Sequence, residues 1–242
     1  MVFERLESRL DDAHVSTYLD IIEDVREPTR TVFNYLLDII TSIESVDLQN
    51  EYTIFGGYAV LTHLMDHYGD KIIKMWRGSS DIDIAASISV LNLLHAFYHV
   101  NSDKSSPNIQ DKRTVKLQLP KEDLCKIDFT LDNEQKRYDR EVKAMLGIPI
   151  NVGTPYSLIK SKLRIAQAEN NHRVDIMNLL RIIEDRQDNT DSIVRYLEPT
   201  ERKMLKDVIN RMGRRLPNER MVMEPSDRYL SQIKSRLEKA YM

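Results

Sequence analysis

The spacing of apolar residues divides this chain into two halves of different character. In the first half, helical and strand periodicities alternate. Apolar residues recur every three or four positions from Thr29 to about Ser45, which predicts a helix that Pro28 or Thr29 opens. Alternation of apolar and polar residues predicts strands over 51–55, 81–86, 114–119 and 126–131. Further helices are expected over 58–67 and 90–100.

Three smaller features complete the first half. The segments 114–119 and 126–131 have the pattern of paired strands joined by a turn at 120–123. The polar stretch 101–112 shows no periodicity and is predicted to be a loop. Residues 148–152 are predicted to form a further short strand, which Pro149 would confine to a sheet edge because proline has no N–H to donate.

After Gly153 the pattern becomes helical only. Thr154 is suited to cap a helix N-terminus and Pro155 to occupy the first turn. Helices are expected over 155–169, 172–187, 200–213 and 226–240. The sequence therefore predicts an α/β (α+β) fold in which a mixed sheet flanked by helices precedes a C-terminal helical domain, with domains at 1–154 and 155–242.

Composition adds limits on the class of protein. With 242 residues, 41% of them hydrophobic and 30% charged, the chain is expected to be soluble and globular. It has no apolar stretch long enough for a bilayer, and its charged N-terminus is unlike a signal peptide. The single cysteine, Cys125, excludes an intrachain disulfide and fits a cytoplasmic location.

Charge is unevenly distributed although the net charge is only −3. Residues 1–50 hold 4 Lys and Arg against 11 Asp and Glu, whereas residues 201–242 hold 11 against 6. The basic C-terminal segment is either an ordinary solvated helix surface or a face for an anionic partner.

Two carboxylates on one strand are the first sign of chemistry. Asp81 and Asp83 alternate with Ile82 and Ile84, so both aspartates lie on one face of the predicted strand. They are either exposed positions of a half-buried strand or the ligands of a divalent cation that offsets their repulsion.

Asp128 favours the metal interpretation. It interrupts an apolar strand between Ile127 and Phe129, where aspartate has low intrinsic preference. If the two strands are neighbours, three carboxylates converge, and such a set can hold two Mg²⁺ ions for in-line displacement at phosphorus.

A glycine pair precedes these carboxylates. Gly56-Gly57 joins a predicted strand to a predicted helix, a geometry that lets a phosphate approach the backbone and the free N–H groups of the first helical turn. The same pair is also explained by a tight turn alone.

These motifs together resemble the DNA polymerase beta-like nucleotidyltransferase superfamily. The resemblance rests on Gly56-Gly57, on Arg77-x-Ser79-x-Asp81-Ile82-Asp83 and on Asp128. Within it, the chain is most similar to the branch of AbiEii-type toxins from toxin–antitoxin systems, because the segments 158–163 and 173–176 match the later Lys and Asp motifs of that branch. The similarity covers roughly residues 30–180.

The resemblance implies a role for each matched residue. Asp81 and Asp83 would be metal ligands, and Asp128 either a third ligand or the base that activates the acceptor hydroxyl. Lys162 would neutralise the triphosphate and Asp175 would complete the polar wall of the site. Ser79 would donate to a phosphate, Arg77 would brace the strand or a phosphate, and Gly56 and Gly57 would contact the nucleotide.

Three positions depart from the pattern of that branch. The interval from Gly57 to Asp81 is long, Val174 stands where arginine is common, and Lys160 competes with Lys162 for the lysine role. Without the resemblance, Lys162 and Asp175 would be equally well explained as surface residues of helices.

Taken together, the sequence predicts a Mg²⁺-dependent nucleotidyltransferase that moves a nucleoside monophosphate from a nucleoside triphosphate to an acceptor hydroxyl. If the toxin resemblance extends to function, the acceptor is tRNA or another RNA and an antitoxin is the expected partner protein. The alternatives are an inactive nucleotide-binding regulatory module and a small-molecule nucleotidyltransferase of the antibiotic-modifying kind.

Two other features are interpreted structurally. The i,i+4 pair His63 and His67 lacks a third metal ligand nearby, so it is expected to be ordinary helix surface or core. Trp76 is expected to pack beneath the strand that follows it rather than stack on a base.

Overall fold

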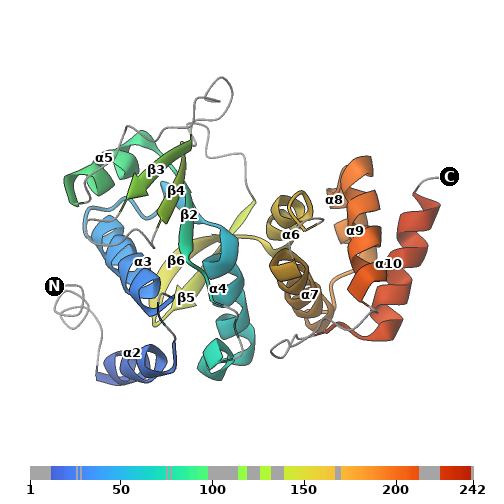
Figure 1. Cartoon of the computed structure of the whole chain (residues 1–242), viewed down its shortest axis with the longest axis horizontal. Helices are drawn as coiled ribbons and strands as arrows, with labels where there is room; N and C mark the ends of the chain where they lie inside the picture. The colour runs from blue at the N-terminus through green and yellow to red at the C-terminus, as the bar shows by residue number, and fades with distance from the viewer. Residues whose placement is uncertain are drawn as a thin grey trace. The chain divides into compact units, whose positions relative to one another are not determined.

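The chain forms two compact units, Met1–Gly153 and Thr154–Met242, in a computed structural model (Figure 1). The structure describes residues 12–25, 27, 29–74, 76, 78–97, 114–118, 126–131, 139–166, 170–212 and 224–240.

A six-stranded mixed sheet is the centre of the first unit, with strand order β3-β4-β2-β1-β6-β5. Its strands are β1 (Tyr52–Ile54), β2 (Asp81–Ala86), β3 (Thr114–Gln118), β4 (Lys126–Leu131), β5 (Arg140–Met145) and β6 (Ile148–Gly153). β2 pairs antiparallel with β1 and parallel with β4, so it lies in the interior of the sheet. Ile82, Ile84, Ile127 and Phe129 are at most 1% exposed, as expected for apolar residues on the covered face of two interior strands.

Helices cover this sheet. They are α2 (Asp12–Asp24), α3 (Thr29–Glu44), α4 (Gly56–Tyr68), the 3₁₀ helix η1 (Asp70–Lys74) and α5 (Ile88–Phe97). α4 packs against β2, β5 and β6, whereas α3 contacts β2 and α5 contacts β4. Ten of the sixteen residues of α3 are buried, and seven of these ten are apolar.

The predicted fold class is confirmed, and most of the predicted elements of the first unit are present. The structure contains the helix predicted from Thr29, the strand predicted over 81–86 and the antiparallel pairing of β3 with β4. The helix predicted over 58–67 begins two residues earlier, at Gly56. The predicted loop at 101–112, the turn at 120–123 and Cys125 lie outside the described residues.

The prediction that Pro149 places its strand at a sheet edge is wrong. β6 lies between β1 and β5, in the interior of the sheet. β1 is only three residues long, and its register with β6 joins Ile54 to Val152, three positions beyond Pro149. Pro149 itself is paired with Ala144 of β5. Proline is tolerated because no second strand pairs with β6 at that position.

The second unit is helical throughout the part that the structure describes. Its helices are α6 (Pro155–Leu163), α7 (Asn170–Asp185), α8 (Thr190–Tyr196), α9 (Pro199–Met212) and α10 (Asp227–Lys239). Thr154 caps α6 as predicted, its hydroxyl accepting from the Ser157 N–H at 3.3 Å, and Pro155 begins the helix. Among the described residues no helix is both long and apolar enough to cross a membrane.

One predicted helix of this unit is shorter in the structure. α6 ends at Leu163 instead of continuing to 169, and residues 164–166 form a turn. The Arg173 Nε of α7 donates to the Ala166 carbonyl at 2.7 Å. This contact satisfies a carbonyl just beyond the end of the helix, where no further turn of α6 is present to do so.

Candidate metal centre

Two parallel strands place three carboxylates side by side. β2 and β4 pair in a register that sets Asp83 directly beside Asp128 and Asp81 beside Lys126. Because side chains alternate along a strand, Asp81 and Asp83 share a face of the sheet while Ile82 and Ile84 face the opposite way. The convergence of the three aspartates that the sequence predicted is therefore present.

The three carboxylates are close enough to share a cation. One oxygen from each of Asp81, Asp83 and Asp128 lies within 4.8 Å of the oxygens of the other two, and all three residues are half-buried. Like charges directly opposite on adjacent strands repel, and partial burial removes some of the water that would screen them. Three hard oxygen donors at this separation fit Mg²⁺ or Mn²⁺, so the residues present suit the metal that the sequence predicts.

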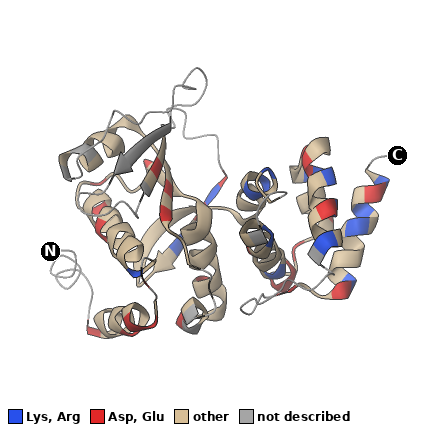
Figure 2. Ribbon diagram, viewed as in Figure 1, with Lys and Arg blue, Asp and Glu red and all other residues tan. Residues whose placement is uncertain are grey.

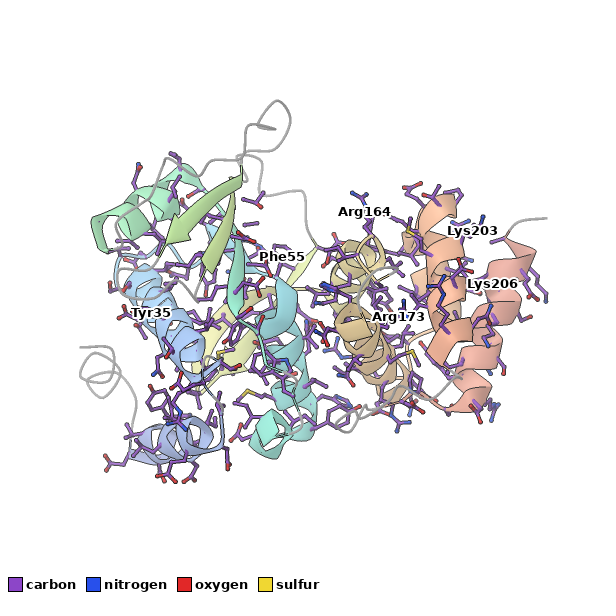
Figure 3. The ribbon with its side chains drawn as sticks, viewed as in Figure 1. Tyr35, Phe55, Arg164, Arg173, Lys203 and Lys206 are labelled. Carbon is purple, nitrogen blue, oxygen red and sulfur yellow. The ribbon has the colours of Figure 1, made fainter. Side chains whose placement is uncertain are left out.

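The start of α4 lies against one of these carboxylates. Gly56, the first residue of α4, has a φ of +66°, and a Cβ built there would lie 1.8 Å from the Asp83 Oδ2. Only glycine satisfies both the backbone conformation and this approach. Phe55, at the N-cap position and labelled in Figure 3, makes no side-chain hydrogen bond to the helix end. The first turn of α4 therefore has no side-chain cap beside the carboxylate cluster.

The segment before β2 is held by contacts that the sequence did not predict. The Tyr58 hydroxyl of α4 donates to the carbonyls of Thr29 at 3.2 Å and Ser79 at 3.3 Å. Trp76 is 5% exposed, with its ring centroid 5.0 Å from that of Tyr58. It packs in the core, as expected. The only sequence signal for Tyr58 was its place just after the glycine pair.

Ser79 contacts the carboxylate cluster directly. It is buried, and its Oγ donates to the Asp81 Oδ1 at 2.8 Å. The hydroxyl that was expected to donate to a phosphate thus orients a carboxylate in this structure. Arg77, the other predicted phosphate contact in this segment, lies outside the described residues.

Lys162 and Asp175 lie in the second unit and contact each other. The Lys162 Nζ is 2.7 Å from the Asp175 Oδ2, and the two side chains are 4% and 0% exposed. The interpretation of both as surface residues is wrong. Burial of an ion pair in this geometry removes both charges from water, so each depends on the other for its stability. Lys160, the competing lysine, instead lies 3.5 Å from Glu201 and is one-third exposed.

His63 belongs to the core of the first unit. It is fully buried, its Nε2 lies 2.8 Å from the Gly153 carbonyl, and its Nδ1 lies 3.5 Å from Glu141. His67, four residues later on α4, is exposed. The expectation that this pair is ordinary helix surface or core is met.

Comparisons with known proteins add one distant likeness. No protein-family model matches the sequence, and a search of curated proteins finds no significant match. Among solved structures, the chain is similar to ANT(2")-Ia in complex with adenylyl-2"-tobramycin, with a TM-score of 0.44 and 11% sequence identity. The match covers 70% of this chain and 94% of that one.

Proposed function

We propose that this protein is a divalent-metal-dependent nucleotidyltransferase. It would transfer a nucleoside monophosphate from a nucleoside triphosphate to an acceptor hydroxyl. The observation that carries the proposal is the convergence of Asp81, Asp83 and Asp128 on two adjacent parallel strands. Without a cation, the mutual repulsion of three clustered carboxylates would act against folding, so their placement favours a metal function over a purely structural one.

Asp81 and Asp83 would hold the metal, and Asp128 would be a third ligand or the base for the acceptor hydroxyl. When bound, one or two Mg²⁺ ions would neutralise the charge that develops on the triphosphate. The acceptor oxygen forms a bond to the α-phosphorus, and the bond from that phosphorus to the bridging oxygen of the β-phosphate breaks. Pyrophosphate leaves, and the acceptor proton passes to a carboxylate or to water.

The residues around the carboxylates would position the reacting groups. Ser79 fixes the orientation of Asp81 through its 2.8 Å hydrogen bond. Gly56 and Gly57 open α4 beside Asp83, where N–H groups of the first turn are suited to a phosphate. Arg77 would contact a phosphate or brace β2.

Lys162 and Asp175 have proposed roles that follow from the family resemblance. Lys162 would neutralise the triphosphate, with Asp175 holding its ammonium group. Within the second unit the two groups form a buried ion pair, which fixes the position of the Lys162 ammonium group beside Asp175.

RNA is the acceptor that we propose, with tRNA as one form of it. The second unit carries 18 Lys and Arg against 13 Asp and Glu, although the whole chain has a net charge of −3. Excess positive charge on one unit favours a polyanionic partner for that unit. A toxin role with a cognate antitoxin would follow if RNA modification arrests growth.

The test is incubation of the protein with each labelled nucleoside triphosphate, Mg²⁺ and total RNA. We expect label in the RNA fraction, and none when a chelator replaces Mg²⁺. The variant D81N/D83N should lose transfer by at least about 10³-fold, because removal of groups that stabilise transition-state charge has effects of that order.

A matched control distinguishes loss of the proposed metal ligands from a general loss of negative charge. D20N/E23Q removes two exposed carboxylates of α2 and should transfer at the rate of the unmodified protein. Binding of nucleotide without transfer to any acceptor would instead indicate a regulatory module. Transfer to a small hydroxylated compound but never to RNA would indicate a small-molecule enzyme.

A further inference from the structure

A polar groove lies within the second unit, and neither Lys162 nor Asp175 is among the residues that line it. It has a volume of about 1170 Å³. One wall is α10, and the other is the segment from the end of α7 to the start of α8. The groove is open to solvent. Its α10 wall is the last described helix of the chain (Figure 1).

α10 turns an apolar face inward and a donor-rich face to the groove. Tyr229, Ile233 and Leu237 recur every four residues and are buried. The groove side holds Arg228, Ser231, Gln232, Ser235, Arg236 and Lys239. From the first to the last of these, the helix rises roughly 16 Å at 1.5 Å per residue.

The carboxylates of the opposite wall are already used by internal donors. Asp188 accepts from the Tyr156 hydroxyl at 2.8 Å, and Glu184 accepts from the Ser226 N–H at 2.8 Å. Burial and the hydrogen bond to Asp188 raise the pKa of Tyr156, so its hydroxyl stays protonated and continues to donate. The Arg236 Nε, in turn, is 3.0 Å from the Asp191 Oδ1. Neutral donors fix these carboxylates without removing their charge, so the sign of the groove depends on the cations: its lining holds Arg228, Arg236 and Lys239 against Glu184 and Asp188, a net charge of +1.

Two cations of the groove remain available. Arg228 and Lys239 are exposed, and within the described residues neither has an ion pair or a hydrogen bond from its side chain. They stand near opposite ends of α10, with Ser231 and Ser235 between them. A helix face with a free cation near each end and hydroxyl donors between is complementary to a chain of phosphates. Figure 2 shows the basic residues along this helix.

We propose that this groove binds the sugar-phosphate backbone of RNA, and that it holds the acceptor RNA of the reaction proposed above. The second part rests on the proposed function, whereas the binding itself does not.

The composition of the groove favours RNA over an acidic protein. Interfaces between proteins have apolar or aromatic centres, whereas nucleic-acid interfaces are more polar and more positively charged. The large hydrophobic residues that are exposed in the described structure are Leu19, Val46, Ile88, Val142 and Ile165. None of them lines the groove, and its single aromatic residue, Tyr229, is 6% exposed. Recognition would therefore be through the backbone, without stacking of bases.

The test is fluorescence anisotropy with a labelled, mixed-sequence, single-stranded RNA and the full chain, in the absence of nucleotide and metal. R228Q/K239Q should weaken binding roughly tenfold at low salt and reduce the slope of log affinity against log salt by about 1.4, the value for two lost phosphate contacts. The control K203Q/R211Q removes the same charge from exposed positions on α9, outside the groove, and should retain the affinity (Lys203 is labelled in Figure 3). Thermal unfolding checks that both variants fold.

Four outcomes would overturn the proposal. The first is no RNA binding by the unmodified protein, and the second is an equal loss of RNA affinity in R228Q/K239Q and K203Q/R211Q. The third is that R228Q/K239Q does not fold while the single variants R228Q and K239Q both retain the RNA affinity of the unmodified protein. The fourth is displacement of RNA by poly-glutamate of matched charge. The last would indicate an acidic protein partner.

D81N/D83N separates RNA binding by the groove from the proposed reaction. This variant should bind RNA with unchanged affinity while transferring no nucleotide. If the unmodified protein binds RNA through the groove but transfers no nucleotide, the proposed reaction is refuted, whereas the proposal that the groove binds RNA is supported.

Discussion

At residue scale, position 56 has room for glycine and for no other side chain. The φ of +66° and the 1.8 Å approach of a built Cβ to the Asp83 Oδ2 act together. A methyl group at this position has to displace the Asp83 carboxylate or move the start of α4. Gly56 therefore helps to set the position of a proposed metal ligand.

The variant G56A should lower nucleotide transfer by about 100-fold, because misplacement of a reacting group by about 1 Å has effects of that size. Gly69, at the other end of α4, provides the matched control. Its φ is +85°, but a Cβ there would meet nothing within 4 Å. G69A thus carries the backbone strain without the collision and should transfer normally, as measured in the labelled-nucleotide assay. Equal activity of the two variants would show that the contact with Asp83 is unimportant.

Sequence patterns predicted the carboxylates of the site but not the contacts that hold them. Asp81, Asp83 and Asp128 stood out because each interrupts an apolar strand. The hydrogen bonds of Tyr58 to the Thr29 and Ser79 carbonyls join residues 29 and 21 positions apart. No local pattern encodes such a contact, since it depends on how α3, α4 and β2 pack.

At the scale of elements, the pairing of α6 with α7 centres on Lys162 and Asp175. The buried ion pair links the two helices, and its carboxylate is fully inaccessible. K162M removes the ammonium partner of the buried Asp175 carboxylate and should reduce the free energy of unfolding by about 3–5 kcal/mol. In K162M/D175L both charges are gone, so most of that stability should return. Chemical denaturation measures both values.

The same pair of variants separates a structural role from a catalytic one. If Lys162 neutralises the triphosphate, K162M/D175L should fold well and still transfer at least about 100-fold more slowly than the unmodified protein. Full recovery of transfer together with stability would restrict the pair to a structural role.

Elements were predictable where burial follows the ordinary pattern. β2 and α3 have apolar residues on the buried side, and both were predicted nearly to the residue. β5 was not predicted, because its pattern is inverted: Val142 is 65% exposed, whereas Glu141 and Lys143 are half-buried. Lys143 is 2.7 Å from Asp66 of α4, so charge pairing replaces apolar contact there. α8, with only seven residues, was also missed.

At the scale of the whole molecule, the two units differ in the charge they carry and in the chemistry they are suited to. The first unit holds the carboxylate cluster, and the second holds the buried ion pair and the polar groove. The sequence predicted an excess of basic residues after position 200. It did not predict the groove, because that depends on which acidic residues α7 and α8 bring opposite α10.

The most direct test of the central claim is a calorimetric titration of the full chain with Mn²⁺, with and without competing Mg²⁺. We predict that the unmodified protein binds Mn²⁺, that Mg²⁺ displaces it, and that D81N/D83N abolishes this binding while D20N/E23Q retains it. Binding of Mn²⁺ by D81N/D83N with the affinity of the unmodified protein, or no Mn²⁺ binding by the unmodified protein, would contradict the assignment of Asp81, Asp83 and Asp128 as a metal centre.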